Sequence, residues 1–418
     1  MTPPQALRAF LILSATRWLP VGFTVATFAL VALERGLTVG QIGSFMAVQG
    51  IVVFLLELPT SGVADVVGRR PLLLIAGAFN LGAGLLYIAA DTFWVFAAAA
   101  ALMGVYRALD SGPLEAWYVD VLHASEPGAD PDRAMARQGV VAGVAMAVGS
   151  LTAGGLIAWH PVRAESALLL PLQVYVVLGA AHVGLTALLM REPRRRNLRE
   201  PSTARMTVRA TLGEAAQVAR DGVGLLRTGA VLRSTILVTA FWAFGMVVFE
   251  AMQPVRLAEL LGSQAQAGAI MGPVAAAAWG VFALGSAVAE VSFKRIGVAR
   301  TALAARALNG VGAVVMGLAL TPVALIGAYL PTYGLHGSAG AAHAVLLHRE
   351  ATARNRSTVL SLNSMVGFIA WSLAVFVVTR LAEVATNQVA MVVAGAVSIV
   401  GIALYIPALK QERRAETE

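Results

Sequence analysis

The sequence predicts an all-α polytopic membrane protein in which twelve transmembrane helices form two bundles of six. Three observations predict this fold class: the composition, a series of apolar segments of bilayer length, and an internal repeat. Of the 418 residues, 58% are hydrophobic and only 13% are charged, whereas soluble proteins average about 45–50% apolar and about 25% charged residues. The composition therefore excludes a soluble globular protein, a disordered chain and a nucleic-acid-binding module.

Apolar segments long enough to cross a bilayer occur twelve times along the chain. A hydrocarbon core of about 30 Å needs roughly 20 apolar residues in a helix. The first segment is too long for a cleaved signal peptide and is interrupted by Arg17. The segments fall into two groups of six with a polar interval between them: 9–33, 41–61, 71–90, 93–114, 138–159 and 167–190, then 231–252, 266–288, 301–320, 323–346, 358–379 and 387–408.

Lysine and arginine gather on one side of the predicted helices. With the N-terminus inside, 25 of the 31 basic residues, Arg306 among them, fall in cytoplasmic loops and tails, and only Arg17 and Arg107 fall within spans. Cytoplasmic loops of membrane proteins carry an excess of Lys and Arg. Both termini are therefore predicted to be cytoplasmic, and the net charge of +8 needs no nucleic-acid partner.

The polar interval divides the chain into three parts. We predict an N-terminal six-helix bundle at 1–190, a cytoplasmic linker at 191–230, and a C-terminal six-helix bundle with a cytoplasmic tail at 231–418. Within the linker, apolar residues from Val208 to Leu226 recur at helical spacing, with arginines off that stripe. This pattern indicates an amphipathic helix lying on an anionic lipid leaflet. An exposed linker helix without a membrane role is the alternative.

An internal repeat at an offset of 225 residues relates the two groups of spans. The matches occur at equivalent places in both groups, which indicates that a six-helix unit was duplicated. The matched pairs are Glu34 with Glu259, Gln41 with Gln266, Gly43 with Gly268, Asp65 with Glu290, Arg69 with Lys294, and Arg70 with Arg295.

The loop between the second and third spans carries the most specific motif, Gly62-Val63-Ala64-Asp65-Val66-Val67-Gly68-Arg69-Arg70. It resembles the G-x-L-A-D-x-x-G-R-R/K signature of the major facilitator superfamily, with a degenerate copy between spans eight and nine. Glycine lets two helix ends approach closely, and a carboxylate can accept hydrogen bonds from a helix N-terminus or an arginine. The resemblance implies a clamp that holds the halves in one conformation, with these members: Gly62, Asp65, Gly68, Arg69, Arg70, Asp120, Glu290, Lys294 and Arg295.

Ionisable residues lie deep within the predicted spans of the first half. Span four carries Arg107-Ala108-Leu109-Asp110-Ser111-Gly112, which resembles the R-x-x-Q-G element that the superfamily associates with proton coupling. Buried charges cost at least about 2.5–3.5 kcal/mol each, so this pair either has a function or neutralises itself at i, i+3. We expect Arg17, Glu57, Arg107 and Asp110 to form one buried polar network, in which Glu57 or Asp110 carries the coupled proton.

Span five contains a run of small residues from Gly149 to Gly155. It is similar to the antiporter motif G-P-x-x-G-G, with Ser150 in place of the proline and Ala153 in place of the first paired glycine. The resemblance implies close packing of this helix against span eight through Gly149, Ser150, Gly154 and Gly155. Ordinary packing of small residues between membrane helices is the alternative.

In the second half, the candidates for the substrate cavity are Trp242, Glu250 and Trp279, together with Arg17 from the first half. Glu250 lies late in span seven and faces either the cavity or the outer interface. The two tryptophans line an aromatic cavity or pack against other helices and lipid. His336 and His343 stand two helical turns apart, which makes a poor metal site and predicts polar packing.

The resemblance covers the whole chain and implies a secondary transporter that works by alternating access, with its substrate site between the two bundles. Within the superfamily, the sequence is most similar to the bacterial twelve-helix drug/proton antiporters, which implies proton-coupled efflux of small hydrophobic compounds. One alternative is an importer or facilitator of a small, possibly anionic metabolite whose carboxylate binds Arg17 or Arg107. A non-transporting membrane sensor or scaffold is an alternative from another class.

No ATP-binding P-loop and no catalytic loop motif occurs in the sequence, which also contains no cysteine. We therefore expect no enzyme activity, no cofactor and no metal site. The expected partners are a small-molecule substrate, protons and the lipid bilayer. The expected state is a monomer in the cytoplasmic (inner) cell membrane.

Overall fold

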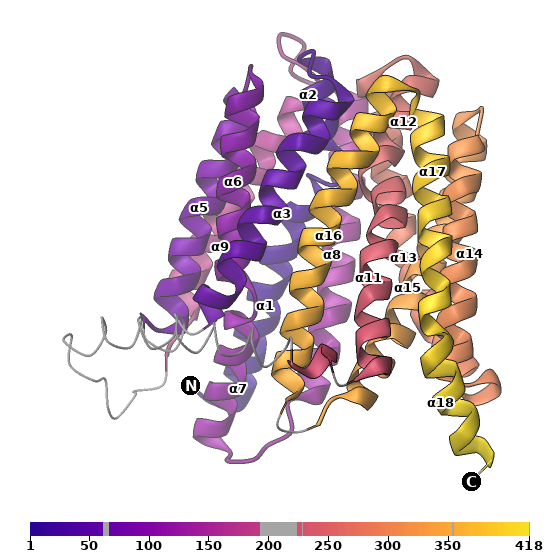
Figure 1. Ribbon diagram of the computed structural model, residues 1–418. Helices are drawn as coiled ribbons and strands as arrows, with labels where there is room; N and C mark the ends of the chain where they lie inside the picture. The colour runs from indigo at the N-terminus through magenta and orange to yellow at the C-terminus, as the bar shows by residue number, and fades with distance from the viewer. Residues whose placement is uncertain (62–66, 193–223, 228, 353–354, 418) are drawn as a thin grey trace.

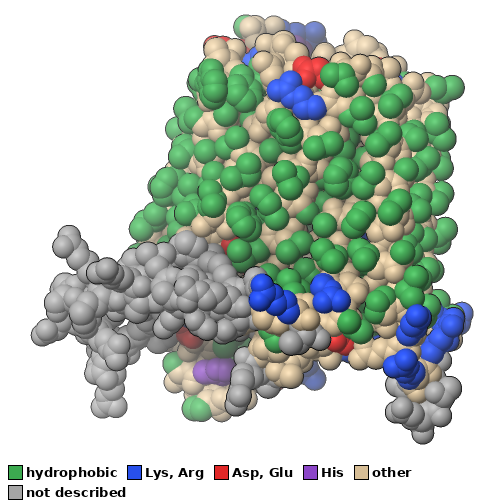
Figure 2. Space-filling model, viewed as in Figure 1, with side chains coloured by type: hydrophobic (Ala, Val, Ile, Leu, Met, Phe, Trp, Pro, Cys, Tyr) green, Lys and Arg blue, Asp and Glu red, His purple; other side chains and the backbone are tan. Residues whose placement is uncertain are grey.

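The computed structural model describes residues 1–61, 67–192, 224–227, 229–352 and 355–417. Two bundles of membrane-length helices stand side by side, and both chain termini lie at the same end of the molecule (Figure 1). We call this end the termini side and the opposite end the far side. Hydrophobic side chains cover the middle of the face seen in Figure 2, and charged side chains concentrate near its two ends, as a membrane protein requires.

Each bundle contains six helical segments that cross its full height, and some segments are made of two or three consecutive helices. The first bundle consists of α1 Pro3–Gly22 with α2 Thr27–Glu34, α3 Val39–Ser61, α5 Arg69–Ala89, α6 Phe93–Asp110 with α7 Pro113–Ser125, α8 Asp132–Trp159, and α9 Leu169–Leu189. The second consists of α11 Ala230–Val247 with a π-helical turn η1 Val248–Met252 and α12 Gln253–Leu261, α13 Gln264–Ile296, α14 Val298–Leu318, α15 Pro322–Glu350, α16 Arg356–Val384, and α17 Asn387–Val400 with η2 Gly401–Tyr405 and α18 Ile406–Thr417.

Eleven of these segments are long and apolar enough to cross a membrane. The remaining one, α15, has 29 residues but carries tyrosines, threonine and histidine that are buried inside the second bundle. Because these polar groups face protein rather than lipid, composition alone understates the suitability of α15 as a membrane helix. The described segments thus agree with the twelve-helix prediction.

The same helix pairs pack together in both bundles, which is how the duplicated unit appears in three dimensions. The first bundle pairs α1 with α8 and α9, α5 with α6 and α9, and α3 with α6; the second pairs α11 with α16 and α17, α14 with α15 and α17, and α13 with α15. The second span of each bundle also begins with the same cap. The hydroxyl of Thr38 accepts the Gln41 N–H at 3.2 Å, and the hydroxyl of Ser263, 225 residues later, accepts the Gln266 N–H at 3.2 Å.

Several helices extend beyond the predicted spans, and the length of α13 changes the interpretation of the residues between spans eight and nine. It continues to Ile296, so Glu290, Lys294 and Arg295 lie on a helix, and the prediction that they form a loop between spans eight and nine is wrong. Glu290 and Lys294 form an exposed i, i+4 ion pair at 3.4 Å. An apolar segment ends at its first charged residues, but a helix continues as long as its backbone hydrogen bonds do.

At the termini side, the two bundles share an equivalent capping site at the N-terminus of their third span. Gly68, with φ of 100°, precedes α5, and Glu192 accepts the Arg70 N–H at 2.8 Å. Gly297, with φ of 85°, precedes α14, and Glu412 accepts the N–H groups of Val298 and Ala299 at 3.0 and 2.9 Å. In each bundle a carboxylate at or just beyond the termini-side end of the sixth segment therefore caps the N-terminus of the third, where the helix dipole favours a negative charge.

Replacement of Glu412 by Ala is expected to lower the free energy of unfolding by about 1–2 kcal/mol, the usual cost of losing an N-terminal cap. The variant loses two hydrogen bonds to backbone N–H groups and the ion pair with Arg349 at 2.8 Å. Glu290→Ala is the matched control, because it removes only an exposed pair worth about 0.3–0.5 kcal/mol. Thermal unfolding in detergent compares the two, and equal shifts in Tm would contradict the capping role of Glu412.

The bundles contact each other chiefly along two helix pairs, α3 with α16 and α8 with α13, and α2 adds smaller contacts with α12 and α13. A Cβ atom added at Gly154 of α8 would lie 2.8 Å from the Cα of Gly272, so these two backbones touch. Eleven residues earlier on the same face of α8, a Cβ atom at Gly143 would meet no described heavy atom within 4 Å. The α8–α13 crossing is therefore tightest toward the far side and looser toward the termini side.

The linker prediction and the domain limits remain predictions. The amphipathic stripe from Val208 to Leu226 falls almost entirely in residues 193–223, which lie outside the described residues. Gly62 and Asp65, two members of the predicted clamp, also lie outside them.

Candidate functional site

A cavity of about 490 Å³ lies between the two bundles. Its walls come from α1, α2, α3, α5, α6, α8 and α9 of the first bundle and from η1, α12, α13, α15 and α16 of the second. A second cavity of about 430 Å³ shares Gln49, Arg107, Glu250 and Phe368 with the first. We treat the two as adjoining parts of one space, the central cavity.

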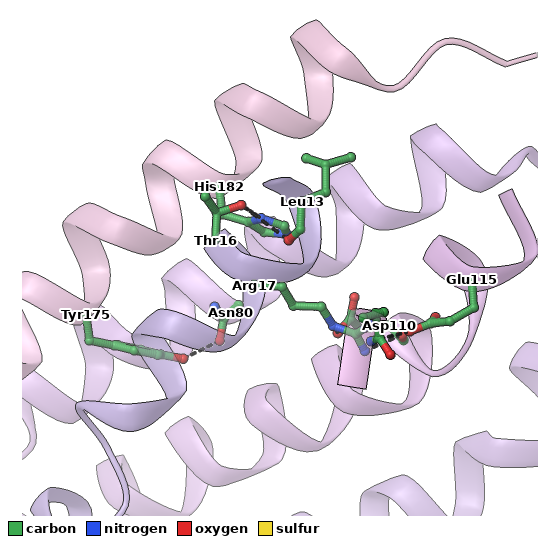
Figure 3. A network of polar contacts seen from close by, with 9 residues as sticks. Leu13, Thr16, Arg17, Asn80, Asp110, Glu115, Tyr175 and His182 are labelled. Atoms are coloured by element: carbon green, nitrogen blue, oxygen red, sulfur yellow. Dashed lines mark hydrogen bonds and ion pairs between the residues drawn. The ribbon is translucent and has the colours of Figure 1, made fainter. Parts of the chain in front are cut away.

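The four ionisable residues predicted to form a network in the first bundle all line this cavity. Arg17 of α1 and Asp110 of α6 form its centre, with Arg17 Nε 2.6 Å from Asp110 Oδ2 (Figure 3). Arg17 Nη2 also donates to the backbone carbonyl of Asp110 at 2.9 Å. That carbonyl is available because α6 ends at Asp110, before Gly112 with φ of 92° starts the turn into α7.

Two further residues extend this network, and sequence reasoning missed both. Glu115 of α7 accepts a hydrogen bond from Arg17 Nη1 at 3.3 Å, and Gln138 Nε2 of α8 donates to the same carboxylate oxygen at 3.3 Å. Glu115 lies just beyond the predicted end of span four at residue 114, outside the spans in which buried charges were sought. The turn at Gly112 directs α7 so that Glu115 faces Arg17, and no feature of the sequence indicates this direction.

Arg107 and Glu57 are arranged differently from Arg17 and Asp110. The alternative that Arg107 and Asp110 neutralise each other at i, i+3 is wrong, because the ion pair of Asp110 is with Arg17. Arg107 has an exposed side chain that lines both parts of the central cavity. It forms no ion pair with any of the described residues. Glu57 also lines the cavity, in the last turns of α3.

Other polar contacts of the first bundle fix the helices around the network. The hydroxyl of Thr16 lies 2.9 Å from His182 Nδ1 and joins α1 to α9 (Figure 3). The hydroxyl of Tyr175 donates to the side-chain oxygen of Asn80 and joins α9 to α5. Tyr175 and Asn80 themselves line the cavity.

The second bundle presents a carboxylate bonded to one member of a cluster of aromatic rings. Glu250 faces the cavity rather than the outer interface, and its Oε1 accepts a hydrogen bond from the hydroxyl of Tyr333 at 3.0 Å. The ring centroid of Tyr333 lies 5.8 Å from that of Phe249 and 5.9 Å from that of Trp279. Phe249, Trp279, Tyr329 and Tyr333 all line the cavity, and we call these four residues the aromatic wall.

Trp242 lines the second part of the cavity, and behind it lies a buried cation. The guanidinium carbon of Arg306 stands 4.3 Å from the centroid of the Trp242 ring, and the residue is only 1% exposed. The prediction that Arg306 belongs to a cytoplasmic loop is therefore wrong. A cation–π contact stabilises a desolvated arginine by roughly 2 kcal/mol or more, which helps α14 hold this charge inside the bundle.

Two of the three histidines of α15, His336 and His343, pack as polar groups. His343 is buried, with Tyr405 hydroxyl 3.0 Å from its Nδ1 and Asn363 Oδ1 3.2 Å from its Nε2. His336 stacks on Trp242 with ring centroids 4.9 Å apart. Among the described residues, no three histidine or acidic side chains gather as a metal site would require.

The described part of the predicted clamp lies within the first bundle. Arg69 Nε, at the start of α5, lies 3.3 Å from Asp120 Oδ2 on α7. Arg70 donates through Nη2 to the carbonyl of Ala187 on α9 at 2.6 Å. These contacts join the start of α5, which Gly68 directly precedes, to α7 and α9, and neither contact reaches a helix of the second bundle.

The small residues of α8 contact two different helices. Gly149 and Ser150 pack on α1: a Cβ atom at Gly149 would lie 2.3 Å from the Leu19 carbonyl oxygen, and Ser150 Oγ donates to the Gly22 carbonyl at 3.1 Å. Gly154 packs on α13. A Cβ atom at Gly155 would meet no described heavy atom within 4 Å, so this glycine contributes to neither contact.

Comparison with known proteins identifies the family. The family model described as Major Facilitator Superfamily matches residues 10–375. The chain has no significant sequence match to a curated protein. Among solved structures, the nucleoside transporter NupG superposes with a TM-score of 0.77 at 11% identity, covering 97% of this chain and 99% of NupG.

Two other transporter structures are similar in fold. A POT family transporter in complex with 5-aminolevulinic acid has a TM-score of 0.69 at 12% identity, over 96% of this chain and 94% of that one. The human organic anion transporter MFSD10 (TETRAN) has a TM-score of 0.60 at 16% identity, over 97% of this chain and 100% of that one. At these identities the likeness concerns the fold.

Proposed function

Since the chain belongs to the major facilitator superfamily and is thus a membrane transporter rather than an enzyme, we propose that it couples the movement of a small organic compound to protons by alternating access. The substrate would bind in the central cavity, and the two bundles would rock about it. We further propose that both termini are cytoplasmic, as the distribution of Lys and Arg indicates, and that the chain acts as a monomer.

The Arg17–Asp110 ion pair is the observation that carries the coupling proposal. Both side chains are at most 10% exposed, yet both line the cavity. Protonation of Asp110 would remove its charge and weaken its hold on Arg17, and this pair joins α1 to α6. A proton taken up here would therefore change the packing of two helices that form the substrate site. Glu57 is the other carboxylate of the first bundle that could carry the proton.

For the direction of transport we propose export, as in the drug/proton antiporters that the sequence resembles. The close contact of Gly154 with Gly272 supports this subtype, because the resemblance implies that this part of the antiporter-like motif packs against span eight. The lining combines ionisable side chains with the aromatic wall, which favours an amphipathic compound over a purely hydrophobic one. The alternative, import of a small anionic metabolite, is favoured by Arg107, whose charge faces the cavity without an ion-pair partner among the described residues.

The conformational clamp and the cytoplasmic linker at 191–230, with its amphipathic helix, both remain parts of this proposal. We propose that Gly62 and Asp65 join Gly68, Arg69, Arg70 and Asp120 in stabilising one conformation. The contact of Arg69 with Asp120 supports the membership of these two residues. Glu290, Lys294 and Arg295 have no equivalent contact to another helix among the described residues.

Inverted membrane vesicles test the proposal. Cells that express the protein are first screened against a panel of toxic compounds, and a compound to which they become resistant is then offered to the vesicles. An exporter exchanging substrate for protons accumulates the compound when the vesicle interior is acid, and a proton ionophore abolishes this accumulation. Accumulation in right-side-out vesicles instead would favour the import alternative, and no gradient-driven flux in either orientation would refute the proposal.

A further inference from the structure

The central cavity has two charged poles, one on each bundle. The positive pole is Arg107 of α6, and the negative pole is Glu250 of η1, and each of them lines both parts of the cavity. They form no ion pair with each other among the described residues, and both side chains line the cavity that a ligand would occupy.

The positive pole is prepared for an anionic group. The Arg107 side chain is exposed to the cavity, while the neighbouring carboxylate, Asp110, is already occupied by Arg17. A guanidinium offers several N–H donors in a planar arrangement that matches a carboxylate. Gln49 lines the same region and can add a further hydrogen bond.

The negative pole is prepared for an organic cation. Glu250 Oε1 accepts a hydrogen bond from the hydroxyl of Tyr333 at 3.0 Å, and Glu250 lines the same cavity as the aromatic wall of Phe249, Trp279, Tyr329 and Tyr333. An ammonium group is attracted by a carboxylate and by the faces of aromatic rings. A metal ion is a poor fit for this pole, because aromatic rings supply none of the oxygen ligands that hard cations need.

We propose that the substrate is a zwitterion, a small compound with a carboxylate bound at Arg107 and an ammonium group bound at Glu250, and with an apolar body against the aromatic wall. This inference deepens the proposed function, on which it rests, by naming the substrate class. Because the poles belong to different bundles, such a ligand would also bridge the two halves that move during transport.

The probes are 4-(aminomethyl)benzoate and the unbranched ω-aminoalkanoates of two to eight carbon atoms, which vary the separation of the charges. For the aromatic compound, 4-methylbenzoate keeps only the anionic end and 4-methylbenzylamine only the cationic end; the alkanoates are compared with their ethyl esters and N-acetyl derivatives. Binding to the purified full-length protein is measured by the ligand-dependent rise in Tm, which reports the dissociation constant. We expect the best zwitterion to bind about 10-fold to 100-fold more tightly than its singly charged analogues, as one charged hydrogen-bond contact requires.

Two variants assign the poles. In Arg107→Gln the zwitterion should bind no more tightly than its cationic analogue, and in Glu250→Gln no more tightly than its anionic analogue. Binding of the remaining singly charged analogue shows that each variant is folded. Arg163→Gln and Glu126→Gln change exposed charges in loops outside the cavity and should keep the full preference.

The proposal is overturned if no zwitterion of the series binds more tightly than its singly charged analogues, or if the preference survives in both pole variants. Its failure is distinguishable from failure of the proposed function, because proton-driven flux is measured in vesicles with a compound found by the resistance screen. Flux without zwitterion preference refutes the substrate class alone. Zwitterion preference without flux in either vesicle orientation refutes the transport proposal alone.

Discussion

Proton-driven accumulation of substrate falls to the level of empty vesicles when Asp110 is replaced by Asn, whereas exchange of substrate in the absence of a gradient persists: this is the expected result for the coupling site. Asparagine keeps the size of the side chain and can still accept a hydrogen bond from Arg17, but it cannot release or take up a proton. Substrate exchange needs the bundles to move but needs no net proton transfer. The two activities, measured on one preparation of proteoliposomes, separate coupling from folding.

Glu57→Gln is the matched comparison, since Glu57 lines the same cavity and forms no ion pair among the described residues. If Asp110 carries the proton, Glu57→Gln retains gradient-driven transport; if Glu57 carries it, the two variants exchange their phenotypes. Unchanged gradient-driven transport in both variants would refute the assignment. Arg17→Ala is a less informative variant, because an unpaired buried carboxylate costs about 3–5 kcal/mol of stability.

Replacement of Gly272 by Val is expected to separate α8 from α13 at the far side and to block the transport cycle. A Cβ atom there would lie 2.6 Å from both the Gly154 Cα and the Ser150 carbonyl oxygen. Backbone atoms cannot rotate away as a side chain can, so the helices must move apart. Overpacking of this kind costs about 1–3 kcal/mol, which changes the ratio of two conformations by about 5-fold to 150-fold.

The chain contains no cysteine, so spin labels can be placed at two introduced cysteines without removing native ones. Arg163→Cys and Gln266→Cys lie at exposed positions beyond α8 and at the start of α13. The distance distribution between the labels should shift to longer values in Gly272→Val. Gly155→Val is the control, because a Cβ atom there meets no described heavy atom within 4 Å. The same distribution in both variants would contradict the role of the Gly154–Gly272 crossing.

Much of the architecture could be predicted from the sequence because the bilayer imposes it. A membrane helix needs about 20 apolar residues whatever its neighbours are, so twelve spans and two groups of six can be recognised from composition and length. Even so, α13 was predicted too short, because its last turns carry charges that lie at the edge of the membrane. Arg306 shows the opposite error. Because it is a cation near the end of a span, it was assigned to a loop, although it packs on Trp242 inside the bundle.

The sequence by itself determined that Arg17, Glu57, Arg107 and Asp110 are costly enough inside a membrane to require a partner or a role. Only the tertiary structure decided the partners: Asp110 pairs with Arg17 from another helix, and Arg107, three residues before Asp110, lines the cavity that Glu250 also lines. The reason is physical. The energy of burying a charge depends on the residue itself, but the choice of its partner depends on how the turn at Gly112 and the packing of separate helices direct each side chain.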